Sequence, residues 1–278
     1  MKVNLWGVRG STPTTGPETS YYGGNTSCIS VWEDGWLLIL DGGSGIQKLV
    51  INPELRTKRI DILLTHFHLD HIQGLGFFSA LFNPEMEVHI WGPASSFRSL
   101  HSRLSRYLSP PLFPVLIRDL PCKLTLHDIS NSTFTIGPFT IQSGFVIHPG
   151  PTVGYRVAGC NSVLAYIPDH EPALGKNGII EDRNWVSGID LAKDADLLLH
   201  DAQYTALEYE RKKGWGHSSI DDAGLFAFYA NVKHLLLWHH DPYRTDVQLN
   251  KMFAAFQEHY KYQFDIGLAK EGLEITLK

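Results

Sequence analysis

One short segment of the chain gathers four side chains that can bind a metal ion. Residues 65–71 (THFHLDH) follow a strand-like apolar run. His66 and His68 alternate by two, so at the end of an extended strand they project to the same side, while Asp70 and His71 come around on the next turn. Imidazole and carboxylate ligands suit zinc, manganese or iron, and four exceed what one tetrahedral ion takes from one segment. The segment therefore predicts two metal ions. The alternative is that these are surface or capping residues on a loop, which is disfavoured because so many buried Asp and His side chains would be costly without partners.

The composition fits a folded globular protein and excludes several function classes. The chain has 278 residues, of which 43% are hydrophobic and 19% charged, values that argue against intrinsic disorder. Its net charge of −5 offers no broad positive surface for duplex DNA or an anionic membrane, and its 14 histidines point toward metal binding. The scattered Cys28, Cys122 and Cys160 are expected to be core thiols rather than a disulfide framework. Without a signal-peptide pattern or a long apolar window, we expect a cytoplasmic protein that does not enter the membrane.

The elements that must position the motif alternate between strands and helices. Short β-branched runs punctuated by Gly and Pro predict strands at 3–8, 28–43 with a turn at Asp34-Gly35, 60–66, 87–93, 133–148, 152–159, 162–169, 196–202, 234–240 and 273–278. Helical stretches are expected near 45–52, 70–82, 95–107, 203–213, 218–231 and 245–260. The Pro-rich stretch 109–115 is too short and apolar for a linker, so we expect one domain over 1–278. Two packed sheets with helices on both outer faces fit this order.

The segment THFHLDHIQG (65–74) resembles the HxHxDH signature of the metallo-β-lactamase fold hydrolases. The resemblance implies an α/β (α+β) four-layer αββα sandwich with a dinuclear site at one sheet edge. It also implies that the second half supplies a third His, a bridging Asp and a last His, for which His148, Asp169 and His239 each end a predicted strand. On this basis one ion is assigned to His66, His68 and His148 and the other to Asp70, His71 and His239, with Asp169 between them. A strand-end histidine is also commonly structural, and His240 is the alternative to His239.

Two further motifs are similar to the ribonuclease Z-type phosphodiesterase branch of this family. Residues 216–219 (GHSS) are similar to its GHST motif and lie 22 residues before His239, and the strand DLLLHDA (196–202) is similar to its strand ending in His-Glu-Ala, with Asp201 replacing Glu. His68 stands where a Glu would suggest the diiron redox branch, and the Cys of many β-lactamases is replaced by Asp169. The GHSS motif also reads as a helix N-cap, and both roles are expected. Asp201 would orient His217 or a ligand His, or form a buried salt bridge.

The resemblance implies hydrolysis of a phosphodiester with two divalent ions, zinc or manganese. Asp70 would orient the attacking water or take its proton, and His217 would protonate the departing alkoxide. The alternatives are hydrolysis of an ester, thioester or lactone on the same fold, and a non-catalytic metal-binding protein.

The substrate is expected to be small. Long-arm relatives process transfer RNA with an arm between the third His and the bridging Asp, but here only 20 residues separate His148 from Asp169. We therefore expect a small phosphodiester, such as a cyclic nucleotide, rather than long RNA or DNA. A homodimer is the assembly that the resemblance implies. Two sets of residues have two interpretations each. Arg98, Arg103 and Arg106 form either a solvated face or a patch that steers a phosphate. Tyr21 and Tyr22 either stack on a base or pack in a turn.

Overall fold

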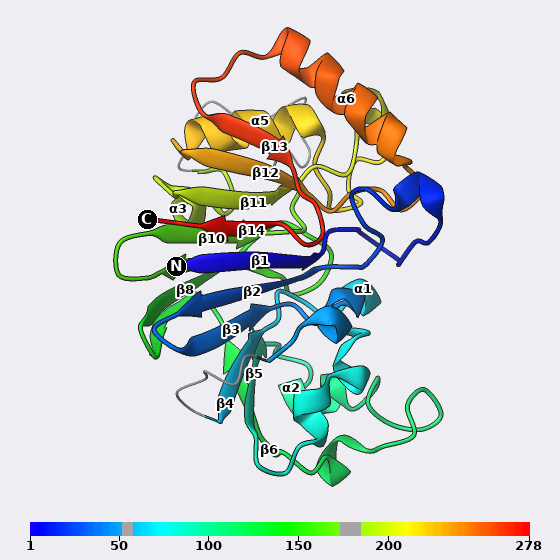
Figure 1. Cartoon of the computed structure of the whole chain (residues 1–278), viewed down its shortest axis with the longest axis vertical. Coiled ribbons are helices and arrows are strands. Elements are labelled where there is room, and N and C mark those ends of the chain that lie inside the picture. The colour runs from blue at the N-terminus through cyan, green and yellow to red at the C-terminus, as the bar shows by residue number, and fades with distance from the viewer. Residues whose placement is uncertain (52–57, 173–184) are drawn as a thin grey trace.

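Two seven-stranded sheets lie at the centre of the computed structural model, which describes residues 1–51, 58–172 and 185–278. Within this part, the first sheet has the order β14-β1-β2-β3-β4-β5-β6 and the second the order β13-β12-β11-β10-β9-β8-β7. Helices α1 and α2 lie toward one end of the molecule and α5 and α6 toward the other (Figure 1). Each group packs on the outer face of a sheet, so the predicted αββα layer order is confirmed.

The strands and helices have the following bounds. The first sheet contains β1 (Lys2–Gly7), β2 (Cys28–Glu33), β3 (Trp36–Leu40), β4 (Arg59–Leu63), β5 (Glu87–Pro93), β6 (Lys123–Ile129) and β14 (Glu274–Thr276). The second contains β7 (Ser132–Ile136), β8 (Phe139–Phe145), β9 (Val153–Ala158), β10 (Val163–Ile167), β11 (Leu197–Asp201), β12 (His234–Trp238) and β13 (Asp265–Leu268). The helices are α1 (Leu69–Ile72), α2 (Leu100–Leu104), α3 (Ile189–Ala192), α4 (Ala206–Glu210), α5 (Ile220–Tyr229) and α6 (Asp246–His259).

The central strands are apolar on both faces because each sheet is covered on both sides. Along β3, Leu38 and Leu40 belong to the core between the sheets, whereas Leu37 and Ile39 belong to the core under the outer helices. Tyr166 and Trp238 of the second sheet fill the inner core and are fully buried. Burying one such side chain stabilises the fold by about 1.5–3 kcal/mol. The continuous apolar runs in the sequence follow from this double coverage.

The direction of the strands decides where the polar residues gather. Strands β3 to β6 run parallel to one another, and so do β10 to β13. The carboxyl ends of parallel strands meet at one edge of a sheet, where the loops that follow can bind ligands. The loops after β3, β4, β10, β11 and β12 therefore share one end of the sandwich.

Several predicted elements are shorter than expected. The stretch 70–82 is divided into α1 and two 3₁₀ turns, Leu75–Phe77 and Ser79–Phe82. Its Gly74 lies so close to the 41–45 loop that a Cβ there would be 2.1 Å from the carbonyl oxygen of Gly43. In the stretch 95–107 only α2 is helical, and 45–52 contains a 3₁₀ turn, Ser44–Lys48, with Asn52 outside the described residues. Strands β6 and β13 and helix α3 were not predicted.

The three cysteines differ in burial. Cys28 and Cys122 are buried as expected, but Cys160 is exposed, because it lies in the turn between β9 and β10. The expectation of a core thiol is therefore wrong for Cys160. Among the described residues, no helix is both long and apolar enough to cross a membrane.

Candidate metal centre

The loop after β4 and the start of α1 carry the histidine-rich motif. His68 is the N-cap of α1 in extended conformation, so the chain turns there and brings Asp70 and His71 onto the first helical turn. The helix is held against the loop after β3, because the Gly42 amide donates to the carbonyl of His71 at 2.7 Å. Thr65, before the motif, donates its amide to Asp41 Oδ1 at 2.8 Å. The motif therefore stands on a backbone fixed by two loops of the first sheet.

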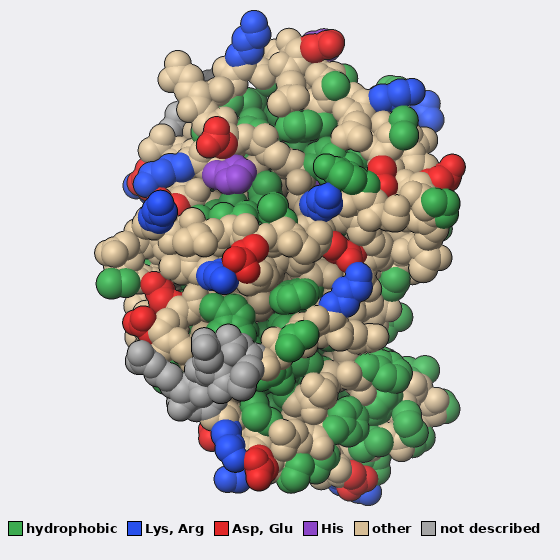
Figure 2. Space-filling model, in the orientation of Figure 1, with side chains coloured by type: hydrophobic (Ala, Val, Ile, Leu, Met, Phe, Trp, Pro, Cys, Tyr) green, Lys and Arg blue, Asp and Glu red, His purple; other side chains and the backbone are tan. Residues whose placement is uncertain are grey.

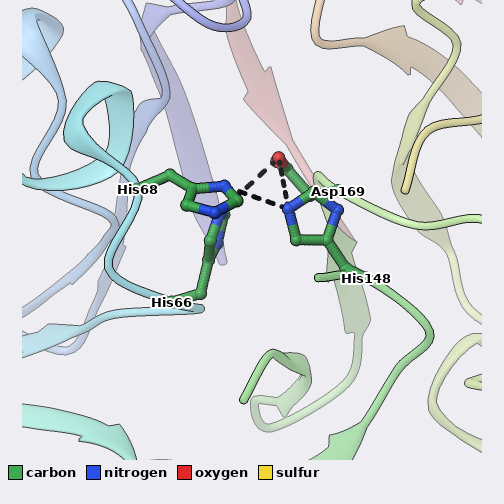
Figure 3. A group of neighbouring side chains, drawn as sticks. All are labelled: His66, His68, His148 and Asp169. Atoms are coloured by element: carbon green, nitrogen blue, oxygen red, sulfur yellow. Dashed lines mark hydrogen bonds and ion pairs between the residues drawn. The ribbon is translucent and has the colours of Figure 1, made fainter. Parts of the chain in front are cut away.

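The first group of predicted ligands converges from both sheets. His66 and His68 face His148 and Asp169 of the second sheet (Figure 3), and one ligand atom from each lies within 4.8 Å of the others. His148 Nε2 is 3.1 Å from His68 Nδ1. Asp169 Oδ2 is 3.6 Å from His66 Nε2 and 3.7 Å from His148 Nε2.

The second group lies on the other side of Asp169. His71 Nε2 is 3.0 Å from Asp169 Oδ1 and 3.4 Å from Asp70 Oδ2. His239 Nε2 is 3.4 Å from Asp169 Oδ1 and 3.3 Å from Asp70 Oδ2. Asp169 thus presents Oδ2 to the first group and Oδ1 to the second, so its carboxylate lies between the two groups.

The donor atoms fit a pair of divalent cations. His66 Nε2, His71 Nε2 and Asp169 Oδ1 are buried, yet they have no hydrogen-bond partner in the described part of the chain. A buried polar atom without a hydrogen bond costs about 1–3 kcal/mol, so three of them facing one another require an explanation beyond the ion-pair contacts described above. Nitrogen and carboxylate ligands without thiolate are suited to zinc, manganese or iron. The donor set therefore fits the predicted metal ions.

Four of these histidines are held through their other ring nitrogen. His66 Nδ1 is 3.1 Å from Thr65 Oγ1, and His71 Nδ1 is 2.8 Å from Asp41 Oδ2. His148 Nδ1 bonds to the carbonyl of Gly216 at 2.7 Å, and His239 Nδ1 to Gln203 Oε1 at 3.1 Å. These bonds place a proton on Nδ1, so Nε2 is the nitrogen that would bind a metal ion once it carries no proton. In His68, by contrast, Nδ1 itself faces the group.

Three supporting residues were not predicted from the sequence: Asp41, Gln203 and Ser11. The Ser11 amide donates to Asp70 Oδ2 at 2.7 Å. Asp41 could have been predicted, because it follows the strand 36–40 as Asp169 follows the strand 163–167. Gln203 carries no signal of its own, since its partner His239 is distant in sequence.

His239, and not its neighbour His240, joins the cluster. His239 has a φ of 60°, which turns its ring toward Asp70. Gly10 packs against this ring, and a Cβ at Gly10 would lie 2.3 Å from it. His240 points away and bonds through Nε2 to the carbonyl of Ala269 at 2.8 Å.

His217 lies beside the second group, held by Asp201. Its Nδ1 is 2.7 Å from Asp201 Oδ2, and its ring stacks on that of His239 with centroids 4.8 Å apart. Asp201 also accepts from the amides of His170 and Gln203, so its position is fixed by backbone. The neighbouring Ser219 caps α5. Asp201 therefore contacts His217, one of its predicted partners. This contact uses Nδ1 of His217 and leaves Nε2 available to a ligand.

The two groups differ in charge. Burial lowers the pKa of His66 well below its ordinary value and that of His148 to about 4. Burial acts in the same direction on His71 and His239, but the carboxylates of Asp169 and Asp70 outweigh it, and raise the pKa of His239 to about 9 and that of His71 well above its ordinary value. The first group is a set of neutral imidazoles, whereas the second is a set of carboxylates and imidazoles that hold protons when no metal is bound.

The structure also shows the surroundings of the other residues singled out in the sequence. Arg103 covers the ring of Phe67 at 4.5 Å and bonds to Asp128, so it is a packed residue. Arg98 and Arg106 are exposed. Tyr22 is buried and its hydroxyl donates to Asn250, which fits a packed turn. Tyr21 is 58% exposed, with Lys270 Nζ 3.6 Å from its ring centroid.

Comparison with known proteins gives consistent matches. Residues 38–240 match the family described as "Beta-lactamase superfamily domain". The chain is 25% identical over 303 residues to a Ribonuclease Z of Thermoplasma volcanium, and the match covers 94% of each chain. It is similar in structure to the metallo-beta-lactamase fold protein YhfI from Bacillus subtilis, with a TM-score of 0.71, 21% identity and coverage of 99% and 98%. The short form of human tRNase Z has a TM-score of 0.69, 20% identity and full coverage of both chains.

Proposed function

The chain belongs to the beta-lactamase superfamily, and on that premise we propose that it is a metal-dependent phosphodiesterase acting on a small phosphodiester. The observation that carries the proposal is the pair His217 and Asp201 beside the two ligand groups, at an Nδ1 to Oδ2 distance of 2.7 Å. An alkoxide leaving group needs a proton, and an oriented imidazole is the usual donor. Curated relatives named Ribonuclease Z support the same bond class.

His66, His68 and His148 would hold one ion, and Asp70, His71 and His239 the other, with Asp169 shared. When bound, two divalent cations supply Lewis acidity, which activates water and offsets the charge of the phosphate. Asp70 is fixed by the Ser11 amide and faces both His71 and His239, so it would orient the attacking water and accept its proton. Asp201 would keep the His217 proton on Nδ1, and a second proton on Nε2 would pass to the leaving oxygen.

The hairpin between the two halves of the site supports a small substrate. Strands β9 and β10 pair in antiparallel register from Ala158 with Val163, and the amide of Gly159 donates to the carbonyl of Ser162 across the turn. Residues 149–168 therefore form a compact hairpin with no extruded arm. On the face that Figure 2 shows, Lys and Arg are interspersed with Asp and Glu rather than gathered in one basic surface. Both features favour a small phosphodiester over long RNA.

Activity assays test this proposal. The protein loaded with Zn²⁺ or Mn²⁺ should hydrolyse bis(p-nitrophenyl) phosphate and members of a panel of 2′,3′- and 3′,5′-cyclic nucleotides, and leave a precursor tRNA transcript intact. Preferential hydrolysis of a lactone or thioester would favour the alternative function, and tRNA cleavage would overturn the small-substrate assignment. His217→Ala should lower turnover of cyclic nucleotides about 10²–10⁴-fold at unchanged metal content. His101→Ala, an exposed histidine, is the matched control.

The predicted cytoplasmic location and homodimer stay predictions. Light scattering on the purified chain tests the homodimer, which should give twice the mass of 31.2 kDa.

A further inference from the structure

A buried carboxylate two residues after Asp169 has no role in the mechanism above. Glu171 follows β10 and is 1% exposed. Its Oε1 accepts from the Gly214 amide at 2.7 Å and from the Tyr209 hydroxyl at 3.0 Å, and its Oε2 accepts from the Gly216 amide at 2.7 Å. In the described part of the chain no Lys, Arg or His forms an ion pair with it. Its buried oxygens are thus directed at one loop and one hydroxyl.

That loop carries His217. The Gly216 amide donates to Glu171, and the Gly216 carbonyl accepts from Nδ1 of His148 at 2.7 Å. Gly216 has a φ of 89°, and a Cβ there would lie 2.5 Å from His148 Nδ1, so only glycine fits. One peptide segment therefore joins the buried carboxylate, a predicted metal ligand and the predicted acid.

The far side of His217 is fixed as well. The Ser218 hydroxyl donates to the carbonyl of His170 at 2.6 Å, and the Tyr204 amide donates to the carbonyl of Ser218 at 3.1 Å. The segment 169–171 thus binds the loop on both sides of His217, at His170 and at Glu171. Hydrogen bonds to a carboxylate are roughly twice as strong as those between neutral groups, so Glu171 supplies the stronger attachment.

We propose that Glu171 is a positioning residue, which holds the loop 214–217 so that His217 faces the leaving group of the substrate. The proposal rests on the proposed function, because it assigns His217 the role of acid. Glu171→Gln keeps the size of the side chain but turns one acceptor into a donor that faces a backbone N–H. The loop then loses a bond while Asp169, Asp70 and their neighbours keep theirs.

A leaving-group comparison separates positioning from a purely structural role. Two diesters of one nucleoside 5′-phosphate are used, a p-nitrophenyl ester, whose phenolate leaves without protonation, and a benzyl ester, whose alkoxide needs a proton. In Glu171→Gln, kcat for the benzyl ester should fall about 10–100-fold and kcat for the p-nitrophenyl ester less than about threefold, with KM unchanged. His217→Ala should show the same pattern with a larger loss. Glu210→Gln, the same change at an exposed residue of α4 that pairs with Lys213, should match the unmodified protein.

A second measurement does not depend on turnover. Long-range ¹H–¹⁵N spectra of the metal-loaded protein report the proton on His217 Nδ1, which the Asp201 bond fixes. This signal should be present in the unmodified protein and in Glu210→Gln, and broadened or shifted in Glu171→Gln and Glu171→Ala. Thermal unfolding and metal analysis on the same samples identify variants that are folded and loaded.

The outcomes are distinguishable. Equal losses on both esters, or an unchanged His217 signal in folded and loaded Glu171 variants, would overturn the positioning role. Failure of the unmodified protein to hydrolyse either diester would instead contradict the proposed function, and the His217 signal alone would then decide whether Glu171 positions this ring.

Discussion

The two groups of predicted ligands on either side of Asp169 hold their histidines with different hydrogen-bond partners. His66 and His148 rest on neutral partners, the Thr65 hydroxyl and the Gly216 carbonyl. His71, in the other group, is bonded at Nδ1 to the buried carboxylate of Asp41. A carboxylate behind a ligating imidazole makes it more basic, whereas a neutral partner only orients it.

The charge difference has a consequence for metal binding. Burial keeps the pKa of His148 low, at about 4, so this predicted ligand is a neutral imidazole at neutral pH, with its one ring proton on Nδ1. His239, whose pKa the carboxylates of Asp169 and Asp70 raise to about 9 against the effect of burial, must lose a proton before it binds a metal. We therefore expect the first group to bind an ion near neutral pH without releasing protons, and the second to bind one in exchange for protons. Four substitutions and the dependence of metal binding on pH test this difference.

The largest effect is expected from the residue that both groups share. Asp169→Asn removes the charge that faces the two groups, so bound metal should fall from two ions per chain to one or fewer, and turnover by about 10³-fold or more. Metal analysis after gel filtration and the rate on bis(p-nitrophenyl) phosphate measure this. Asp128→Asn, the same change at a half-exposed carboxylate paired with Arg103, is the control. Two tightly held ions in Asp169→Asn would show that the groups do not depend on a shared carboxylate.

Single histidine variants should separate the groups. His148→Ala should lose the ion of the first group and His239→Ala that of the second, each with a loss of about 10²–10³-fold in kcat/KM. Metal stoichiometry should be one ion in each variant. If either substitution released both ions, the two groups would be one cooperative site rather than two.

A smaller effect is expected behind the second group. Asp41→Asn leaves the shape of the side chain but removes the charge next to His71, and losses of about 10–100-fold in metal affinity are typical for such a partner. Competition with a chelator should show this loss for the second ion only. Because Asp41 also accepts from Thr65 and Tyr166, thermal unfolding must be followed in parallel. An equal loss of affinity for both ions would argue against separate groups.

The smallest effect is the dependence of metal binding on pH. The raised pKa values of His71 and His239 mean that both carry protons at pH 7 without a metal ion, so binding of the second ion should release protons and tighten as the pH rises toward about 9. The first ion should release almost none above about pH 6.5, because the pKa of each of its histidines is lowered by burial. Zinc titration calorimetry in buffers of different ionisation enthalpy measures both. Equal proton release for the two ions would contradict the assigned charges.

How much of the site could be predicted depends on where each residue lies in the chain. The segment 65–71 places four groups within one turn, and His148, Asp169 and His239 follow apolar runs. Strand-end position and family resemblance therefore sufficed to predict which side chains the structure brings together. The choice between His239 and His240 could be predicted only by resemblance, because it depends on a φ of 60° and on the close approach of Gly10.

Apart from Asp41, the residues that support the predicted ligands could not be predicted from strand ends or family resemblance. Glu171 contacts Tyr209, Gly214 and Gly216, which lie 38 to 45 positions away in the chain, and Gln203 contacts His239, 36 positions away. Nothing in their local pattern distinguishes Glu171 and Gln203 from ordinary polar loop residues. The predicted helix lengths were wrong for a related reason. In 70–82, packing of Gly74 against the 41–45 loop outweighs the helical spacing of the apolar residues, and such a tertiary contact is invisible in a single segment.

The most direct test of the account is anomalous diffraction from crystals of the zinc- or manganese-loaded protein, with data on both sides of the metal absorption edge. The account predicts two peaks about 3.5–4 Å apart, one among His66, His68 and His148, the other among Asp70, His71 and His239, with Asp169 bound to both. A fully active crystal form with a single peak, or with peaks remote from these residues, would contradict it.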